Sequence, residues 1–110
     1  MDPVREQLAA YNERDLERFL ACYAADTVIE DGQGQVLMEG VAQMRERYGR
    51  LFAASPDLHC QIRNHMAVGS YQIDEEYITG LNNGQDIVEV DAIVIYRVED
   101  GQIVHVRMLS

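Results

Sequence analysis

One run near the C-terminal end of the sequence constrains the fold more than any other. From Ala92 to Val98 nearly every residue is apolar, and several are β-branched. This pattern is typical of a central strand that is covered on both faces. A short turn over 99–102, with Gly101 for a positive φ, leads into a second apolar run over 103–109. The sequence therefore predicts a β-hairpin against which the rest of the chain packs.

Helical patterns occupy much of the first half of the chain. Asp2 followed by Pro3 is a good helix start, because aspartate accepts a capping hydrogen bond and proline suits the first helical position. Asp15 can cap a second helix, which is expected to end near residues 24–26. A third helix should follow Gly40 and stop at residues 55–57, where proline ends it.

Strands make up the remainder. Short strands are expected over 27–31 and 36–38. From Leu58 onward the hydrophobic period becomes two, which predicts strands over 58–68 and 71–81 ahead of the central strand that contains residues 92–98. In the first of these, one face is expected to carry Leu58, Cys60, Ile62, Met66 and Val68. The prediction is a single α+β domain over residues 1–110. Three N-terminal helices pack on a strongly curved, mixed but mostly antiparallel sheet, and this cone encloses a hollow for a small ligand.

Charge excludes several classes of function. The formal net charge is −10, so a nucleic acid or an anionic membrane surface would be repelled. The sequence has no apolar targeting core and no run near the ~20 apolar residues that a membrane span needs, so we expect a cytoplasmic protein. All nine basic residues are arginines, which excludes Schiff-base chemistry on lysine.

The sequence gives no sign of a metal site or a cofactor. His59, His65 and His105 lack the spacing of metal ligands. Cys22 and Cys60 are isolated, which favours two buried free thiols, although a disulfide between them stays open. No serine has the context of a nucleophile elbow.

Several motifs resemble the nuclear transport factor 2-like superfamily, which includes ketosteroid isomerases and SnoaL-like polyketide cyclases. The segments over 12–17 and 22–31 resemble its helix–strand opening, the segment over 95–104 resembles its closing hairpin, and Gly40 fits the start of its third helix. The resemblance covers essentially the whole chain. The run over 65–81 is most similar to an uncharacterised SnoaL-like branch.

The resemblance implies roles for particular residues. Asp31 matches the proton-shuttling aspartate of the ketosteroid isomerases, and Tyr23 and Tyr48 match two supporting tyrosines. Gln7 stands where those enzymes have the tyrosine of the oxyanion site, and Val94 stands where they have its partner aspartic acid. The set of donors that would stabilise an enolate therefore differs from that of a steroid isomerase.

Each of these residues has an alternative interpretation. Asp31, expected at the opening of the hollow, is either a general base or a turn-capping aspartate. Tyr11, Tyr23 and Tyr48 are either a tyrosine network lining the pocket or ordinary core residues. Gln7 either donates to a ligand carbonyl or lies on the helix surface. Two further contacts to substrate are predicted, from Met44 and Val94.

Glu75 is unexpected because it shares a strand face with Ile73 and Tyr77. Inside the cone it would contact substrate as a second acid/base candidate. Otherwise it lies at a dimer contact, or the strand bulges or frays at residues 74–76 and leaves its three acids in water. Ile93 and Ile95 are expected on the outer face of the sheet. An apolar outer face tends to be covered, so we expect a homodimer through that face.

Two functional hypotheses follow. In the first, the protein is a cofactor-free isomerase or cyclase that acts on a small apolar carbonyl compound by proton transfer, with Asp31 as the base. In the second, it is a non-catalytic small-ligand-binding or dimerisation domain of the same fold. The ionisable residue at position 31 favours the first, and Val94 favours the second.

Overall fold

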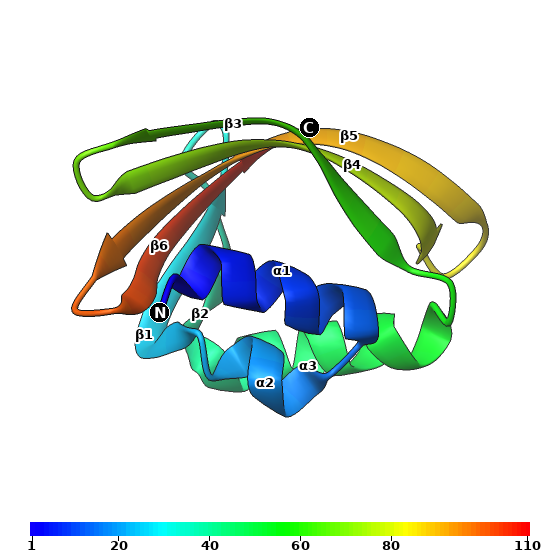
Figure 1. Ribbon diagram of the computed structural model, residues 1–110. Coiled ribbons are helices and arrows are strands. Elements are labelled where there is room, and N and C mark those ends of the chain that lie inside the picture. The colour runs from blue at the N-terminus through cyan, green and yellow to red at the C-terminus, as the bar shows by residue number, and fades with distance from the viewer.

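A computed structural model describes residues 1–110 and shows three helices and six strands (Figure 1). In chain order the elements are α1 (Pro3–Glu13), α2 (Leu16–Leu20), β1 (Tyr23–Asp31), β2 (Val36–Glu39), α3 (Gly40–Ala54), β3 (His59–Val68), β4 (Tyr71–Asn82), β5 (Ile87–Glu99) and β6 (Gln102–Leu109). None of the helices is long and apolar enough to cross a lipid bilayer.

The strands form one open sheet in the order β2-β1-β6-β5-β4-β3. Strands β1 and β6 pair in parallel and the other neighbours pair antiparallel, so the sheet is mixed. Figure 1 shows the long strands arching over the three helices, which all lie on the concave side. This arrangement confirms the predicted α+β cone.

The local signals in the sequence act as expected at most of the element ends. The Asp2 side chain accepts the Val4 N–H at 3.0 Å and caps α1, and Asp15 accepts the Arg18 N–H at 3.2 Å and caps α2. Between β5 and β6, Asp100 and Gly101 both have positive φ, at 52° and 76°. Such a pair is what a tight two-residue hairpin turn requires.

The predicted end of the second helix was wrong. Helix α2 stops at Leu20, and β1 already begins at Tyr23. The Ile103 N–H donates to the Cys22 carbonyl at 2.9 Å, so pairing with β6 draws this segment into the sheet. Ala24 and Ala25 therefore belong to the sheet, because pairing with β6 outweighs their preference for a helix.

Irregular pairing bends the sheet and changes which side chains face the helices. The β3–β4 register shifts between Ile62 and Asn64, so the residues beyond it exchange faces. Met66 and Val68, expected on the same face as Cys60, are instead 62% and 67% exposed. A second shift in β4 contains Gly80, where an added Cβ would lie 2.3 Å from the Asp57 carbonyl oxygen.

The helix layer is held by an aromatic cluster centred on Phe19. Its ring centroid lies 4.8 Å from that of Tyr48, 5.1 Å from that of Tyr23 and 5.6 Å from that of Phe52. Pairs at these distances and inclinations add to the burial of their apolar surface. Cys22 and Cys60 are both free and buried. The Tyr11 ring of α1 lies 6.0 Å from that of Phe19, so the aromatic cluster joins the three helices into one layer beneath the sheet.

Candidate functional site

A cavity of about 660 Å³ lies between the helix layer and the concave face of the sheet. Its volume falls within the roughly 300–1,000 Å³ that is usual for small-molecule sites. Nineteen of its 27 lining residues are hydrophobic. The few polar residues are therefore the ones that can orient a ligand and react with it.

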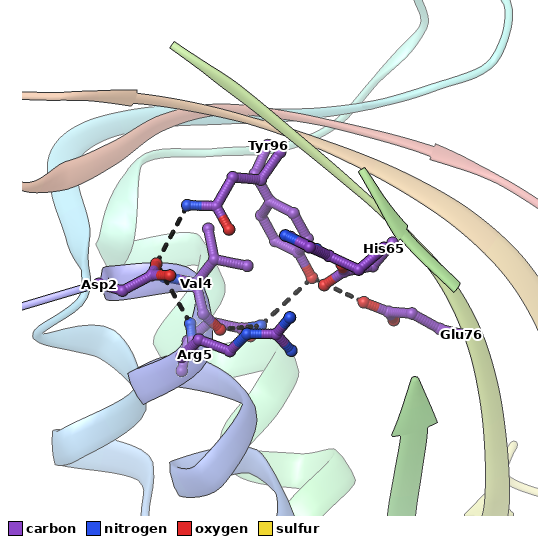
Figure 2. A network of polar contacts seen from close by, with 9 residues as sticks. Asp2, Val4, Arg5, His65, Glu76 and Tyr96 are labelled. Carbon is purple, nitrogen blue, oxygen red and sulfur yellow. Dashed lines mark hydrogen bonds and ion pairs between the residues drawn. The ribbon is translucent and has the colours of Figure 1, made fainter. Parts of the chain in front are cut away.

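A continuous chain of hydrogen bonds crosses the buried end of the cavity. The Tyr23 hydroxyl donates to Gln7 Oε1 at 3.2 Å, Gln7 Nε2 donates to the Tyr96 hydroxyl at 3.3 Å, and that hydroxyl donates to Glu76 Oε2 at 2.9 Å. Gln7 Nε2 also donates to the Val4 carbonyl at 3.0 Å, which fixes the orientation of the amide. Figure 2 shows Tyr96 and Glu76 pointing toward one another from neighbouring strands.

Glu76 is the only acidic side chain that lines the cavity, and it is 6% exposed. Burial, with a smaller contribution from the nearby carboxyl of Asp74, raises the pKa of Glu76 to about 7 even though the hydrogen bond from Tyr96 opposes the rise. At neutral pH this group is therefore poised between its acid and base forms.

The tyrosines of the cavity act as hydroxyl donors rather than as bases. Burial raises the pKa of Tyr48 to about 12 and raises the pKa values of Tyr11, Tyr23 and Tyr96 well above their usual range. Tyr23 and Tyr96 use their hydroxyls within the hydrogen-bond chain. Tyr11 and Tyr48 line the cavity without a protein partner for their hydroxyls, so both can donate to a ligand oxygen.

Five residues that the sequence nominated come together in this cavity. They are Gln7, Tyr11, Tyr23, Tyr48 and Val94. Helical patterns suggested inward faces for the three tyrosines, although Tyr23 belongs to β1. The resemblance nominated Gln7 and Val94. The structure thus brings most of the nominated set to one place, although their roles stay predictions.

Asp31 and Met44 lie elsewhere. Asp31 does not line the cavity, and its Oδ1 accepts the backbone N–H groups of Gln33 and Gln35, each at 2.9 Å. The expected place of Asp31 at the opening of the hollow is therefore corrected to the turn after β1, where the side chain organises the turn backbone. Met44 has no exposed surface and packs in the core of the helix layer, not against the cavity.

Strand β4 does not fray, and Glu75 does not enter the cone. Asp74 and Glu76 are buried on the concave side, whereas Glu75 lies on the outer face, where its Oε1 accepts from Asn64 Nδ2 at 2.6 Å. The sequence suggested that Glu75 faces inward because it shares a face of β4 with the apolar residues Ile73 and Tyr77, but that partly apolar face is the outer one. Alternation along the strand makes the two assignments mutually exclusive.

Sequence reasoning missed Glu76, Tyr96 and Cys60 as parts of the site. One signal was present: Val94 was assigned to the inside of the cone, and Tyr96, two residues further along the same strand, must point to the same face. Cys60 is held in place by Asn12, whose side chain accepts the Cys60 N–H at 2.7 Å and donates to the Cys60 carbonyl at 3.0 Å. No local pattern marks Glu76, which only the register of β4 identifies.

A second buried carboxyl group, that of Asp74, lies on the same face of β4 as Glu76 and pairs with His65. Asp74 is 1% exposed, and its Oδ1 lies 2.5 Å from His65 Nδ1, while its Oδ2 has no hydrogen-bond partner. His65 reaches this position because of the register shift in β3 and remains partly open to solvent. The structure contains no group of three or more histidine, cysteine, aspartate or glutamate side chains placed to share a metal ion.

Known structures share this architecture. An uncharacterised cystatin-fold protein from Novosphingobium aromaticivorans matches with a TM-score of 0.90 and 24% identity, covering 100% of this chain and 99% of its own. A protein of ketosteroid isomerase-like fold from Catenulispora acidiphila, in complex with trimethylamine, matches with a TM-score of 0.78 and 19% identity over 96% of this chain and 82% of its own. At these identities the likeness concerns the fold alone.

A third similar structure is an epoxide hydrolase of M. tuberculosis described as LEH-like. Its TM-score is 0.79 with 20% identity, over 97% of this chain and 78% of its own. No curated protein matches the sequence. The SnoaL-like domain family model matches residues 4–106, nearly the whole chain. The protein therefore belongs to the SnoaL-like domain family, within the nuclear transport factor 2-like superfamily.

Proposed function

We propose that the cavity binds a small, mostly apolar carbonyl compound and that Glu76 transfers a proton at the carbon next to the carbonyl group. The observation that supports this most directly is a desolvated carboxylate, hydrogen-bonded to Tyr96, in an otherwise apolar cavity. A base works best when its pKa lies near the working pH, and the pKa of Glu76 is raised to about 7. The proposal moves the role of base from Asp31 to Glu76.

The proton transfer balances without a cofactor. The ionised Glu76 takes the α-proton, and the electron pair of the broken C–H bond moves onto the carbonyl oxygen as an enolate. The free hydroxyls of Tyr11 and Tyr48 are available to donate to that oxygen, where preorganised donors are worth several kcal/mol. Return of the proton from Glu76 to the same or a conjugated carbon completes an exchange or an isomerisation.

The test is deuterium exchange at the α-carbon of β-tetralone, an apolar ketone with acidic α-hydrogens, followed by proton NMR in heavy water. We expect the protein to accelerate exchange and Glu76→Gln to lose about a hundredfold or more of this acceleration. Glu75→Gln is the matched control, one residue away on the outer face, and should exchange like the parent protein. Equal exchange by the parent and by Glu76→Gln would contradict the assignment.

The second candidate is a non-catalytic ligand-binding domain of the same fold. Its supporting observation is that the Tyr96 hydroxyl already occupies the Glu76 carboxylate with a hydrogen bond. In that case β-tetralone should perturb the NMR signal of the Glu76 carboxyl carbon without any accelerated exchange. Binding with catalysis and binding alone are thus separated in one sample.

We also propose that the protein forms a homodimer through the outer face of the sheet. This face carries an apolar patch, which we call the outer patch, and its most exposed members are Met66 at 62%, Val68 at 67%, Tyr71 at 43% and Ile93 at 46%. The paired registers place Met66 beside Ile73 and Ile93 beside Leu109, so the patch is continuous across four strands. Apolar surface of this kind favours a self-complementary contact.

A further inference from the structure

The cavity has a buried end and an open end with different charges. At the buried end, Glu76 is 6% exposed and Tyr96 is 4% exposed. At the open end, the lining residues Arg47 and Arg50 of α3 are exposed, next to Leu37, which is 39% exposed. The walls between these ends are mostly hydrophobic. A ligand that fills the cavity would therefore meet a carboxyl group at one end and guanidinium groups at the other.

The two arginines differ in how their charges are used. Arg50 Nη1 lies 3.1 Å from Glu46 Oε1, one helical turn away, so its charge is largely compensated. Arg47 makes no ion pair and no hydrogen bond to the protein. It thus presents an uncompensated positive charge to the open end of the cavity.

This lack of a partner stands out in so acidic a chain, with 19 acidic residues and nine arginines. Six arginines make ion pairs with carboxylates, and Arg14 donates to the backbone carbonyls of Asn12 and Leu58. Only Arg5 and Arg47 remain, and Arg5 does not line the cavity. Arg47 is therefore the arginine whose position and unsatisfied donors both point to a ligand.

We infer that the ligand is an amphipathic carboxylate: an apolar body with a carbonyl group at one end and a carboxylate at the other. The carboxylate pairs with Arg47 at the open end, the body lies along the hydrophobic walls, and the carbonyl reaches Glu76 and the free tyrosine hydroxyls. This inference rests on the proposed function, because it assigns the carbonyl end to the same buried site. A guanidinium suits a carboxylate because its planar donors match the two oxygens.

The net charge of −10 does not oppose this assignment at the site itself. At physiological ionic strength, charges in solvent are screened beyond about 8 Å, so the contact with Arg47 outweighs the distant acids. The acid closest in sequence, Glu46, is engaged by Arg50. An amine of the same shape would instead face the guanidinium of Arg47 at the open end and bind less well.

The test compares a biphenylcarbonyl-propanoate, which is a γ-keto acid, with its methyl ester. Both are titrated by calorimetry into the parent protein, Arg47→Gln and Arg63→Gln. The last variant removes an arginine of the outer face and is the matched control. We expect the acid to bind the parent about fivefold more tightly than the ester, as an exposed ion pair allows. Arg47→Gln should abolish this preference without changing the affinity for the ester, and Arg63→Gln should retain it.

Three results would overturn the inference, and they distinguish its failure from that of the proposed function. If the acid and the ester bind the parent equally and both perturb the Glu76 carboxyl signal in NMR, the buried site stands and the carboxylate assignment fails. The same holds if Arg47→Gln keeps the preference for the acid. If neither compound binds or perturbs Glu76, the proposed function fails and the inference fails with it.

Discussion

Glu75 and Glu76 are adjacent in β4 but occupy opposite environments. Glu76 lies on the concave face in a mostly hydrophobic cavity, and burial raises its pKa to about 7. Glu75 lies on the outer face and bonds to Asn64. Because successive side chains of a strand alternate between faces, one step along the chain separates a buried acid with a raised pKa from a surface acid. The face of the sheet, rather than the residue type, determines the chemistry.

The same contrast predicts the largest effect on stability. Met44 and Met66 have the same side chain, but Met44 has no exposed surface and Met66 is 62% exposed. Met44→Ala should lower the free energy of unfolding by about 2–5 kcal/mol, because it removes core contacts and leaves a cavity. Met66→Ala, measured at a protein concentration low enough to keep the chain monomeric, should change it by less than about 1 kcal/mol. Urea denaturation measures both changes in the free energy of unfolding. Similar losses for the two variants would contradict the assignment of Met44 to the core and Met66 to the surface.

Stability should also depend on pH through Glu76. Its pKa rises from 4.5 in the unfolded chain to about 7 in the folded protein, so the folded state keeps a proton that the unfolded chain has already lost. The free energy of unfolding should therefore fall as pH rises from about 4.5 to about 7. At about 1.4 kcal/mol per pH unit, the loss is about 3 kcal/mol.

Two variants isolate this contribution. Glu76→Gln cannot ionise and should lack the decline between pH 4.5 and pH 7, while Glu75→Gln should retain it. Chemical denaturation at a series of pH values supplies the measurement. If the free energy of unfolding of Glu76→Gln declined just as much over this pH range, the decline would belong to another titrating group.

Much of the fold follows from local signals, and less of the site does. The capping aspartates at positions 2 and 15, the turn at Asp100–Gly101 and the apolar hairpin depend on neighbours in sequence, so a reader of the sequence can place them. Tyr11 and Tyr48 were found for the same reason, since helical periodicity shows their inward faces, whereas the resemblance nominated Gln7.

Glu76 and His65 could not be placed in this way. Their faces depend on register, and the register shift between Ile62 and Asn64 reverses the inside and outside of β3 without a glycine or proline to mark it. On β4 both faces carry apolar residues, so alternation alone does not show which face is inside. The resemblance nominated Asp31 by position, but tertiary structure uses that carboxylate in a turn.

The outer patch should control assembly and leave the cavity unaffected. Ile93→Arg places a charge in the proposed dimer contact, so we expect dissociation to become at least about tenfold more favourable. Sedimentation equilibrium measures this change, and the Glu76 carboxyl signal should still titrate as in the parent protein. A parent protein that is monomeric at high concentration would contradict the dimer, whereas a shifted Glu76 titration in Ile93→Arg would show that the two faces are coupled.

The smallest effect should come from the polar contacts of the outer face. Arg63 Nη1 lies 3.1 Å from Asp91 Oδ1, with side chains that are 44% and 76% exposed. A double-mutant cycle with Arg63→Gln and Asp91→Asn should give a coupling below about 1 kcal/mol, because water and salt screen the pair.

On the concave face, Tyr96→Phe removes a donor from the buried Glu76 carboxylate. It should lower the free energy of unfolding by about 1–3 kcal/mol at pH 8, where that group is ionised. A coupling between Arg63 and Asp91 as large as the cost of Tyr96→Phe would contradict this explanation, because access to water would then not weaken the polar contacts of the outer face.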